Sequence, residues 1–229
     1  MWSARSLRAH LDRELVRALP GGRPARILDL SCGCDQAIAG LREHHPEWSW
    51  ESHAPTARQE TASSPRSSDF TPLPFGSNSF DAAIACATVA ACDQPAPLLA
   101  ELFRVLKPGG IALVNVPAHR WLATGNDSAR QVRRRFTAPV LKTELAAAGF
   151  RGIQTTHWNC LAAPALWLRL RLAGSPASPQ APASPVSYAE LPLRALMAAE
   201  HGWILLGGRL PFGESLFAVA RKPFASDFA

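Results

Sequence analysis

Two short apolar runs joined by an amphipathic stretch constrain the fold of this chain more than any other feature. The runs cover residues 80–87 and 111–116, and such runs are typical of strands buried on both faces of a parallel sheet. Between them, apolar residues recur at the spacing of one helix face: Leu98, Leu99, Leu102, Val105 and Leu106. Parallel neighbouring strands need a crossover of this kind, so the sequence predicts an α/β protein.

The helix is expected to end at Lys107-Pro108-Gly109-Gly110. A lysine in the last turn complements the helix dipole, proline cannot propagate the helix, and glycine adopts positive φ without strain. The same patterns predict further elements: an opening helix over 6–19, strands over 26–30 and 48–50, a helix over 139–148 capped by Thr137, a strand over 152–158, and a last strand over 215–221 that pairs antiparallel.

Composition narrows the function classes. The chain has 229 residues, 47% of them apolar, which suffices for one domain with a sizeable core. Its net charge of +6 fits either an acidic partner or an arginine-rich surface with solvated charges. The basic residues form no run interleaved with aromatics, so we expect no nucleic-acid binding. The five cysteines lack CxxC spacing and are expected to be buried free thiols without a metal.

The ends and apolar segments predict a cytoplasmic location. The N-terminal stretch is charged and amphipathic rather than apolar, unlike a secretory signal. No stretch reaches the roughly 18–20 uninterrupted apolar residues of a membrane span.

Several segments resemble the class I S-adenosylmethionine-dependent methyltransferases, in particular their small-molecule type. The matching letters stand at consistent spacing: Leu73-Pro74-Phe75, Asn78-Ser79-Phe80-Asp81 and Arg104-Val105-Leu106-Lys107-Pro108-Gly109-Gly110. The resemblance implies a Rossmann-like, doubly wound, mostly parallel sheet with an antiparallel last strand, and S-adenosylmethionine as cofactor. An alternative is a catalytically degenerate methyltransferase-like protein that serves as a binding or scaffold subunit.

The turn after the first strand is where the resemblance places the methionine part of the cofactor. The family writes this turn DxGxGxG. Here Asp29 and Gly33 are kept, while Ser31 and Asp35 stand where glycines are usual. Serine is a mild change, whereas Asp35 adds a side chain and a negative charge, which requires its carboxylate to point to solvent.

The resemblance assigns the adenosine contacts to residues further along the chain. Glu51 is the candidate for binding both ribose hydroxyls, or else a surface carboxylate at a strand end. Asp69, beside Phe70, would accept a hydrogen bond from the adenine amino group, and Cys86 would line the methyl-bearing end. Residues 52–68 are polar where the family has a helix and a strand, so they are predicted to form a loop. A sheet without one of the family's edge strands would follow from this.

Candidate catalytic and acceptor-binding residues follow the second strand of the crossover. Many relatives carry a histidine ahead of the acid matching Asp93, but this chain does not. His119 is therefore the candidate base or acceptor-orienting group, with His157 behind it. The segment also resembles the family pattern PAxxWL…D…RRYT, which suggests four substrate-pocket residues: Trp121, Asp127, Arg134 and Arg135. Packing would equally explain Trp121, and a solvated turn would explain the arginines.

The expected domain organisation is a core with one insertion. Residues 1–159 and 211–229 form the core, and 160–210 form a helical insertion with a Pro/Ser/Ala-rich linker at 174–187. Residues 161–172 are apolar with two arginines. They suit a lid over a small, lipid-like or carrier-linked acceptor, or peripheral membrane contact. They equally suit packing on the sheet edge, on a partner subunit or in a homodimer.

Overall fold

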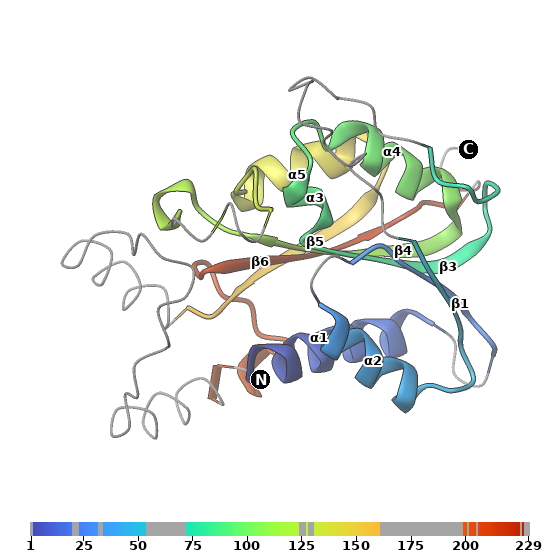
Figure 1. The fold of residues 1–229 in the computed structure, drawn as a ribbon, viewed down its shortest axis with the longest axis horizontal. Coiled ribbons are helices and arrows are strands. Elements are labelled where there is room, and N and C mark those ends of the chain that lie inside the picture. Colours follow the sequence, from blue (N-terminus) through green and yellow to red (C-terminus); the bar gives the residue numbers. More distant parts are fainter. Residues whose placement is uncertain are drawn as a thin grey trace.

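The fold is a six-stranded, mostly parallel sheet with helices on both faces (Figure 1). The computed structural model describes residues 2–19, 23–31, 34–53, 72–123, 127, 131–160, 199–200, 202–204, 206–224 and 226. Its elements are α1 (Trp2–Ala18), β1 (Arg26–Asp29), α2 (Asp35–His44), β2 (Ser49–Ser52), β3 (Phe80–Cys86), α3 (Thr88–Ala91), α4 (Ala96–Val105), β4 (Leu106–Pro117), η1 (Arg120–Leu122), α5 (Ala138–Ala147), β5 (Arg151–Trp158) and β6 (Ser215–Arg221).

The strand order β2-β1-β3-β4-β6-β5 confirms the predicted doubly wound arrangement. Strands β2, β1, β3 and β4 pair in parallel, and β6 is antiparallel to both β4 and β5. Because β4 and β5 both run opposite to β6, their carboxyl ends lie at the same edge of the sheet. Among the described residues β2 is the edge strand on its side, and residues 54–71, which follow it, lie outside the description.

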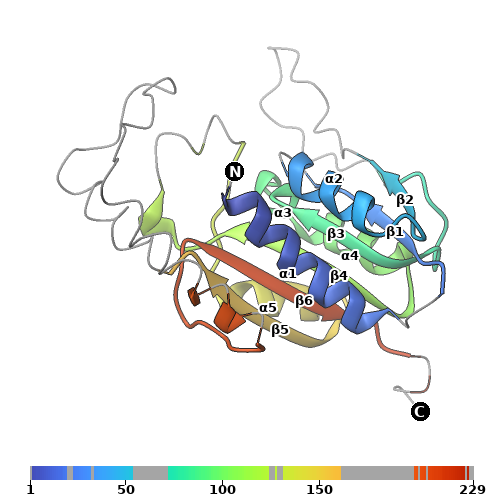
Figure 2. The ribbon, with the colours of Figure 1, turned by 90° about the horizontal axis from the view of Figure 1, so that it is seen from below.

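Two apolar layers hold the helices on the sheet. Helices α1 and α2 cover one face, and α3, α4 and α5 cover the other, as Figures 1 and 2 show. The predicted α4 stripe is fully buried against β3 and β4, together with Phe136 and Phe150. On the other face, Leu11 and Leu15 of α1 pack with Ile84 of β3 and Leu113 of β4. The opening helix therefore lies against the sheet.

Two predicted helix ends differ from the structure. Lys107 does not lie in the last turn of α4, because the helix ends at Val105 and β4 begins at Leu106. Its ammonium group instead lies 2.8 Å from both carboxylate oxygens of Asp81. Thr137 precedes α5 as expected, but its side chain makes no capping hydrogen bond. Gly109 and Gly149 do adopt positive φ, at 81° and 103°.

The structure describes only part of the insertion predicted at 160–210, namely residues 160, 199–200, 202–204 and 206–210. Residues 199–200 and 202–204 are helical, whereas 161–198 lie outside the described residues, and with them the expected lid at 161–172 and the linker. No helix in the described part of the chain is long and apolar enough to cross a membrane.

Candidate functional site

The carboxyl end of β1 is tied to its neighbours by the Asp29 carboxylate. Its Oδ1 accepts the Ser31 amide at 2.9 Å, and its Oδ2 lies 3.3 Å from the Ser52 hydroxyl and 3.4 Å from an Arg42 guanidinium nitrogen. The Asp29 side chain is only 11% exposed. Asp29 therefore fixes the turn that follows β1 against β2 and α2. Sequence reasoning missed Arg42, whose position at the end of α2 gave no signal by itself.

The ends of β1 and β3 are joined by side-chain hydroxyls. The Ser31 hydroxyl accepts the Cys86 amide at 3.3 Å, and the Thr88 hydroxyl donates to the Leu30 carbonyl. Between Cys86 and Thr88, Ala87 has a φ of 64°. This is the left-handed region, which residues with a Cβ seldom adopt, and such strain concentrates at functional sites. The serine that replaces the first glycine thus helps to shape the edge where the cofactor is expected.

Asp35 satisfies the condition set for it. It is the first residue of α2 and is exposed, and a carboxylate in the first turn favours the helix dipole. The exposed position of Asp35 agrees with that requirement, while cofactor binding at this turn stays a prediction. Gly33 lies outside the described residues.

Glu51 is already engaged by a cation. Its Oε1 lies 2.5 Å from an Arg26 guanidinium nitrogen, and this guanidinium also lies over the Phe80 ring, 5.1 Å from its centroid. Both side chains of the pair are partly exposed, and such pairs contribute about 0–1 kcal/mol. The contact uses one carboxylate oxygen, so ribose binding by Glu51 stays a prediction.

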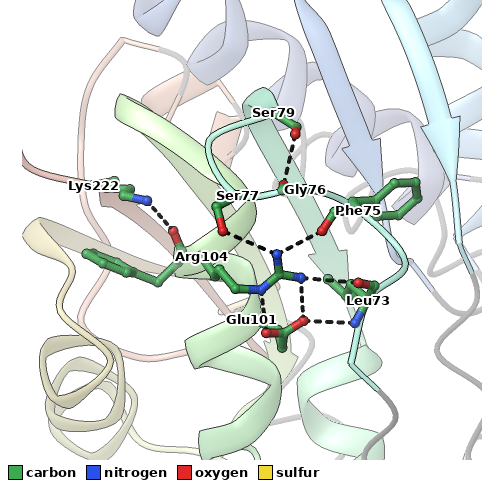
Figure 3. Close-up of polar contacts among 9 residues, drawn as sticks. Leu73, Phe75, Gly76, Ser77, Ser79, Glu101, Arg104 and Lys222 are labelled. Carbon is green, nitrogen blue, oxygen red and sulfur yellow. Dashed lines mark hydrogen bonds and ion pairs between the residues drawn. The ribbon is translucent and has the colours of Figure 1, made fainter.

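The segment that follows the expected adenine contact is firmly anchored (Figure 3). Asp69 and Phe70 lie outside the described residues. Four positions after Asp69, the Leu73 amide donates to Glu101 at 2.8 Å, and its carbonyl accepts from Arg104 at 3.1 Å. Arg104 also donates to the Phe75 carbonyl at 2.8 Å. Helix α4 thus fixes the chain close to the residue predicted to bind adenine.

The structure brings the two candidate catalytic histidines together. His119 follows the carboxyl end of β4 and His157 lies at the carboxyl end of β5, and their rings stack with centroids 5.3 Å apart and planes inclined by 4°. The Nε2 atoms of both rings are buried without a hydrogen-bond partner. His119 has a φ of 51°, a second strained backbone at this edge.

The protonation state of His157 follows from its surroundings. Its Nδ1 lies 3.2 Å from the Leu210 carbonyl, which only accepts hydrogen bonds. The proton of the neutral ring therefore sits on Nδ1, and Nε2 presents a lone pair. Burial lowers the pKa of His157, although the hydrogen bond to Leu210 opposes this shift. The pKa of His119 is lowered first by burial and then by the charges of His157 and Arg135. The lowered pKa values keep both rings neutral at about pH 7.

Two larger aromatic rings extend the histidine stack toward solvent. Trp121 of η1 lies 5.4 Å from His119, and Phe212, just before β6, lies 5.5 Å from it, centroid to centroid. Trp121 and Phe212 stack on each other at 5.6 Å, with planes inclined by 8°. Trp121 is half exposed. Sequence reasoning missed Phe212, although its position in a Pro-Phe-Gly segment before the last strand was a signal that could have indicated it.

The predicted substrate-binding arginines make ion pairs within the protein. Arg135 is largely buried and contacts both Asp127 carboxylate oxygens, at 2.7 and 2.8 Å. It also donates to the Ala118 carbonyl at 3.0 Å, so this pair holds the turn that carries His119. Arg134 contacts Glu144 of α5 at 2.7 Å. Direct substrate contact by these residues stays a prediction, while their described contacts are structural.

The four described cysteines have free thiols, and the prediction that they are buried holds only for Cys86. Cys34, Cys86, Cys92 and Cys160 are free, and of these only Cys86 is fully buried. Cys32 lies outside the described residues. Within the described part of the chain, no group of three or more His, Cys, Asp or Glu side chains is arranged to hold a metal ion.

Comparisons with known proteins agree with the resemblance. Residues 28–114, from β1 to β4, match the family described as a methyltransferase domain. Malonyl-[acyl-carrier protein] O-methyltransferase of Alcanivorax borkumensis is 29% identical over 140 residues, which cover 56% of this chain and 48% of that protein. The chain thus spans about half the length of the curated relative it matches. These matches agree with the methyltransferase resemblance of the segment from β1 to β4.

Solved structures share the fold across nearly the whole chain. A chain from the complex between the Haloferax volcanii Trm112 methyltransferase activator and a methyltransferase has a TM-score of 0.52 and 16% identity, covering 97% of this chain and 94% of that one. A SAM-dependent methyltransferase from Archaeoglobus fulgidus has a TM-score of 0.52 and 14% identity, covering 96% and 94%. Identities this low show the fold alone.

Proposed function

We propose that this chain, a member of the class I S-adenosylmethionine-dependent methyltransferases, transfers a methyl group to a small or carrier-linked acceptor at the carboxyl edge of its sheet. The observation that carries this proposal is the His119–His157 pair. It lies at the same edge as the Asp29–Ser31 turn, and it has two buried ring nitrogens without a hydrogen-bond partner. A purely structural histidine pair would be expected to satisfy these nitrogens.

The cofactor would be held by residues from three neighbouring strands. Asp29 and Ser31 shape the turn for its methionine part, Glu51 binds the ribose, and Cys86 lines the methyl-bearing end; the predicted contacts of Gly33, Asp69 and Phe70 complete the set. When bound, this cofactor supplies an electrophilic methyl group on a sulfonium. The protein's contribution is to hold the acceptor atom in line with it.

His157 would hold the proton that the acceptor loses. Its Nε2 lone pair can accept a hydrogen bond from a hydroxyl or amine and then take that proton, while Nδ1 stays bonded to Leu210. His119 stacks between His157 and the Trp121–Phe212 pair, which offers an apolar wall to the rest of the acceptor. The described site therefore suits an acceptor with an apolar portion and a group that donates a hydrogen bond.

A carrier-linked acceptor is supported by one relative. The Alcanivorax borkumensis protein is named for a malonyl group on an acyl-carrier protein, and the net charge of +6 suits an acidic partner. Contact with a partner subunit, a second copy of the chain or a membrane through residues 161–172 remains a proposal.

Calorimetric titration with S-adenosylhomocysteine tests the proposal. We expect a micromolar Kd, equivalent to about −8 kcal/mol. Asp29→Asn should weaken binding at least tenfold by freeing the Ser31 turn, and Asp69→Asn should weaken it by removing the adenine contact. Glu43→Gln, an exposed change on α2, is the matched control. Folded protein that gives no binding heat would overturn the proposal.

A further inference from the structure

A cavity lies between α1 and the β5–β6 end of the sheet. Its volume is about 370 Å³, and its third wall is formed by Ile204 and residues 206–209. Figures 1 and 2 show α1 and this orange-red segment on the same side of the sheet. The cavity contains none of the residues assigned above to the cofactor or the acceptor.

Strand β6 places this cavity on the α1 face of the sheet. Successive side chains of a strand point to opposite faces. Gln154, Thr155 and Thr156 of β5 all line the cavity, so the face is assigned from β6. On β6, Phe217 and Val219 line the cavity and pack with the α1 layer, while their neighbours Leu216 and Ala218 pack in the α4 layer. The cavity is thus a site of its own on the α1 face.

The cavity concentrates positive charge. Arg13 and Arg17 come from α1 and Arg209 from the facing segment, against the single carboxylate of Glu14, so the formal charge of the lining is three minus one, or +2. Arg13 lies 3.9 Å from Glu14 and donates to the Ile204 carbonyl. Arg17 and Arg209 are exposed, which leaves their guanidinium groups accessible at the rim. Like charges around one hollow repel each other, so an anion between them is favoured.

A small part of the cavity lining is apolar. Ile204 and Phe217 are each only 3% exposed, and both line it with Val219. At the rim, Leu206 is 87% exposed, which adds apolar surface that an occupant would cover. The site therefore suits a ligand that combines an anionic end with a small apolar part.

We infer that this cavity binds an organic phosphate whose remaining part is apolar. Guanidinium groups bind phosphate through paired, charge-assisted hydrogen bonds, and a phosphate dianion matches the +2 lining, whereas a carboxylate carries a single charge. Gln154 adds a side-chain amide beside Arg209, whose guanidinium lies 2.8 Å from the amide oxygen. The apolar body would lie on Phe217.

Three probes separate the contributions. Phenyl phosphate carries both features, inorganic phosphate only the anion, and benzoate an apolar ring with a single charge. By calorimetry on the full chain we expect phenyl phosphate to bind at least tenfold more tightly than either of the others. The double variant Arg17→Gln/Arg209→Gln should lose at least tenfold in affinity for it. Arg23→Gln, an exposed arginine ahead of β1, should leave it unchanged.

The outcomes decide the inference whatever the fate of the proposed methyl transfer. Unchanged affinity in the double variant, or no binding of phenyl phosphate, would overturn the site. Equal affinity for benzoate would overturn the preference for phosphate. Because both substituted arginines are exposed, the urea unfolding midpoint should be the same in the double variant and the parent, which shows that the variant is folded.

Discussion

At the scale of single residues, the thiols differ most in reactivity. Cys34 begins the turn into α2 and packs beside the fully buried Cys86. The Cys86 thiol lowers the pKa of Cys34, against burial and against the carboxylates of Asp29 and Asp35. Burial and then the charge of Glu200 raise the pKa of Cys160 to about 11. The thiolate is the reactive form, so Cys34 is expected to react faster than Cys160.

Alkylation should therefore distinguish the two thiols. At about pH 8, a thiol of pKa about 11 is ionised only about once in a thousand, so Cys34 should react with iodoacetamide at least tenfold faster than Cys160. Peptide mass mapping over time measures both rates in one sample. If the turn binds cofactor, S-adenosylhomocysteine should slow Cys34 alone. Equal rates for the two thiols would contradict the assigned surroundings.

Residue roles were only partly predictable from the sequence. His119 and His157 could be nominated one by one, but their stacking depends on the meeting of two strands that are far apart in the chain. The free Nε2 of His157 depends on Leu210, in a segment without a motif. Likewise, the sequence suggested that Glu51 and Arg135 bind ligands. Only the fold shows that Arg26 contacts Glu51 and that Asp127 contacts Arg135.

At the scale of elements, the apolar runs predicted most strands closely. The strand predicted over 215–221 has those bounds, and β3 ends one residue earlier than expected. Buried strands and amphipathic helices carry their signal locally, which is why these predictions succeed. The end of α4 was predicted wrongly, because the local rule assigned its C-terminal cation to Lys107, whereas the fold supplies one from a distant segment.

Lys222 is the cation that closes the C-terminal end of α4. Its Nζ donates to the carbonyls of Phe103 and Leu106, at 2.7 and 2.8 Å, and to the Asn78 side chain at 2.8 Å. It also lies 4.7 Å from the centroid of the Phe103 ring. Figure 3 shows this lysine reaching toward the helix end. One side chain after β6 thus satisfies carbonyls left over at the end of the crossover helix.

Lys222→Met should destabilise the protein by about 1–3 kcal/mol, since it leaves partly buried carbonyls without their donor. Urea unfolding measures the loss. Lys142→Met, at an exposed position of α5, is the matched control and should change stability by less than about 0.5 kcal/mol. A loss for Lys222→Met no larger than that of the control would show that the helix end does not depend on this contact.

At the scale of the whole molecule, the pKa of a histidine on the α1–α2 face and the pKa values of two histidines at the carboxyl edge shift in opposite directions. On the α1–α2 face, His45 lies 2.5 Å from Asp12 of α1 and 2.9 Å from Glu47, and stacks on Trp48. Burial disfavours its charged form, but the two carboxylates outweigh this and raise its pKa. At the carboxyl edge, burial lowers the pKa values of His119 and His157.

These shifts determine how the free energy of unfolding changes with pH: it should fall above about pH 6.5 (the alkaline limb) and below about pH 6.5 (the acid limb). The contribution of His45 is fully present below the unfolded pKa of about 6.5 and is lost as pH rises through its higher folded pKa. The neutral forms of His119 and His157 favour folding above about pH 6.5, and this contribution is lost as pH falls through their lower folded pKa values. The free energy of unfolding should therefore be greatest near about pH 6.5.

Urea unfolding between about pH 5.5 and 8.5 tests both limbs, since this window lies above the ordinary carboxylate range. His45→Gln should flatten the alkaline limb and leave the acid limb, whereas His157→Gln should reduce the acid limb alone. His44→Gln changes an exposed neighbour and should preserve both. A stability that rises steadily to pH 8.5 in the parent would contradict the pairing of His45 with Asp12. Since His45 joins α1 to the end of α2, loss of the alkaline limb would also show that this contact couples the helical layer to global unfolding.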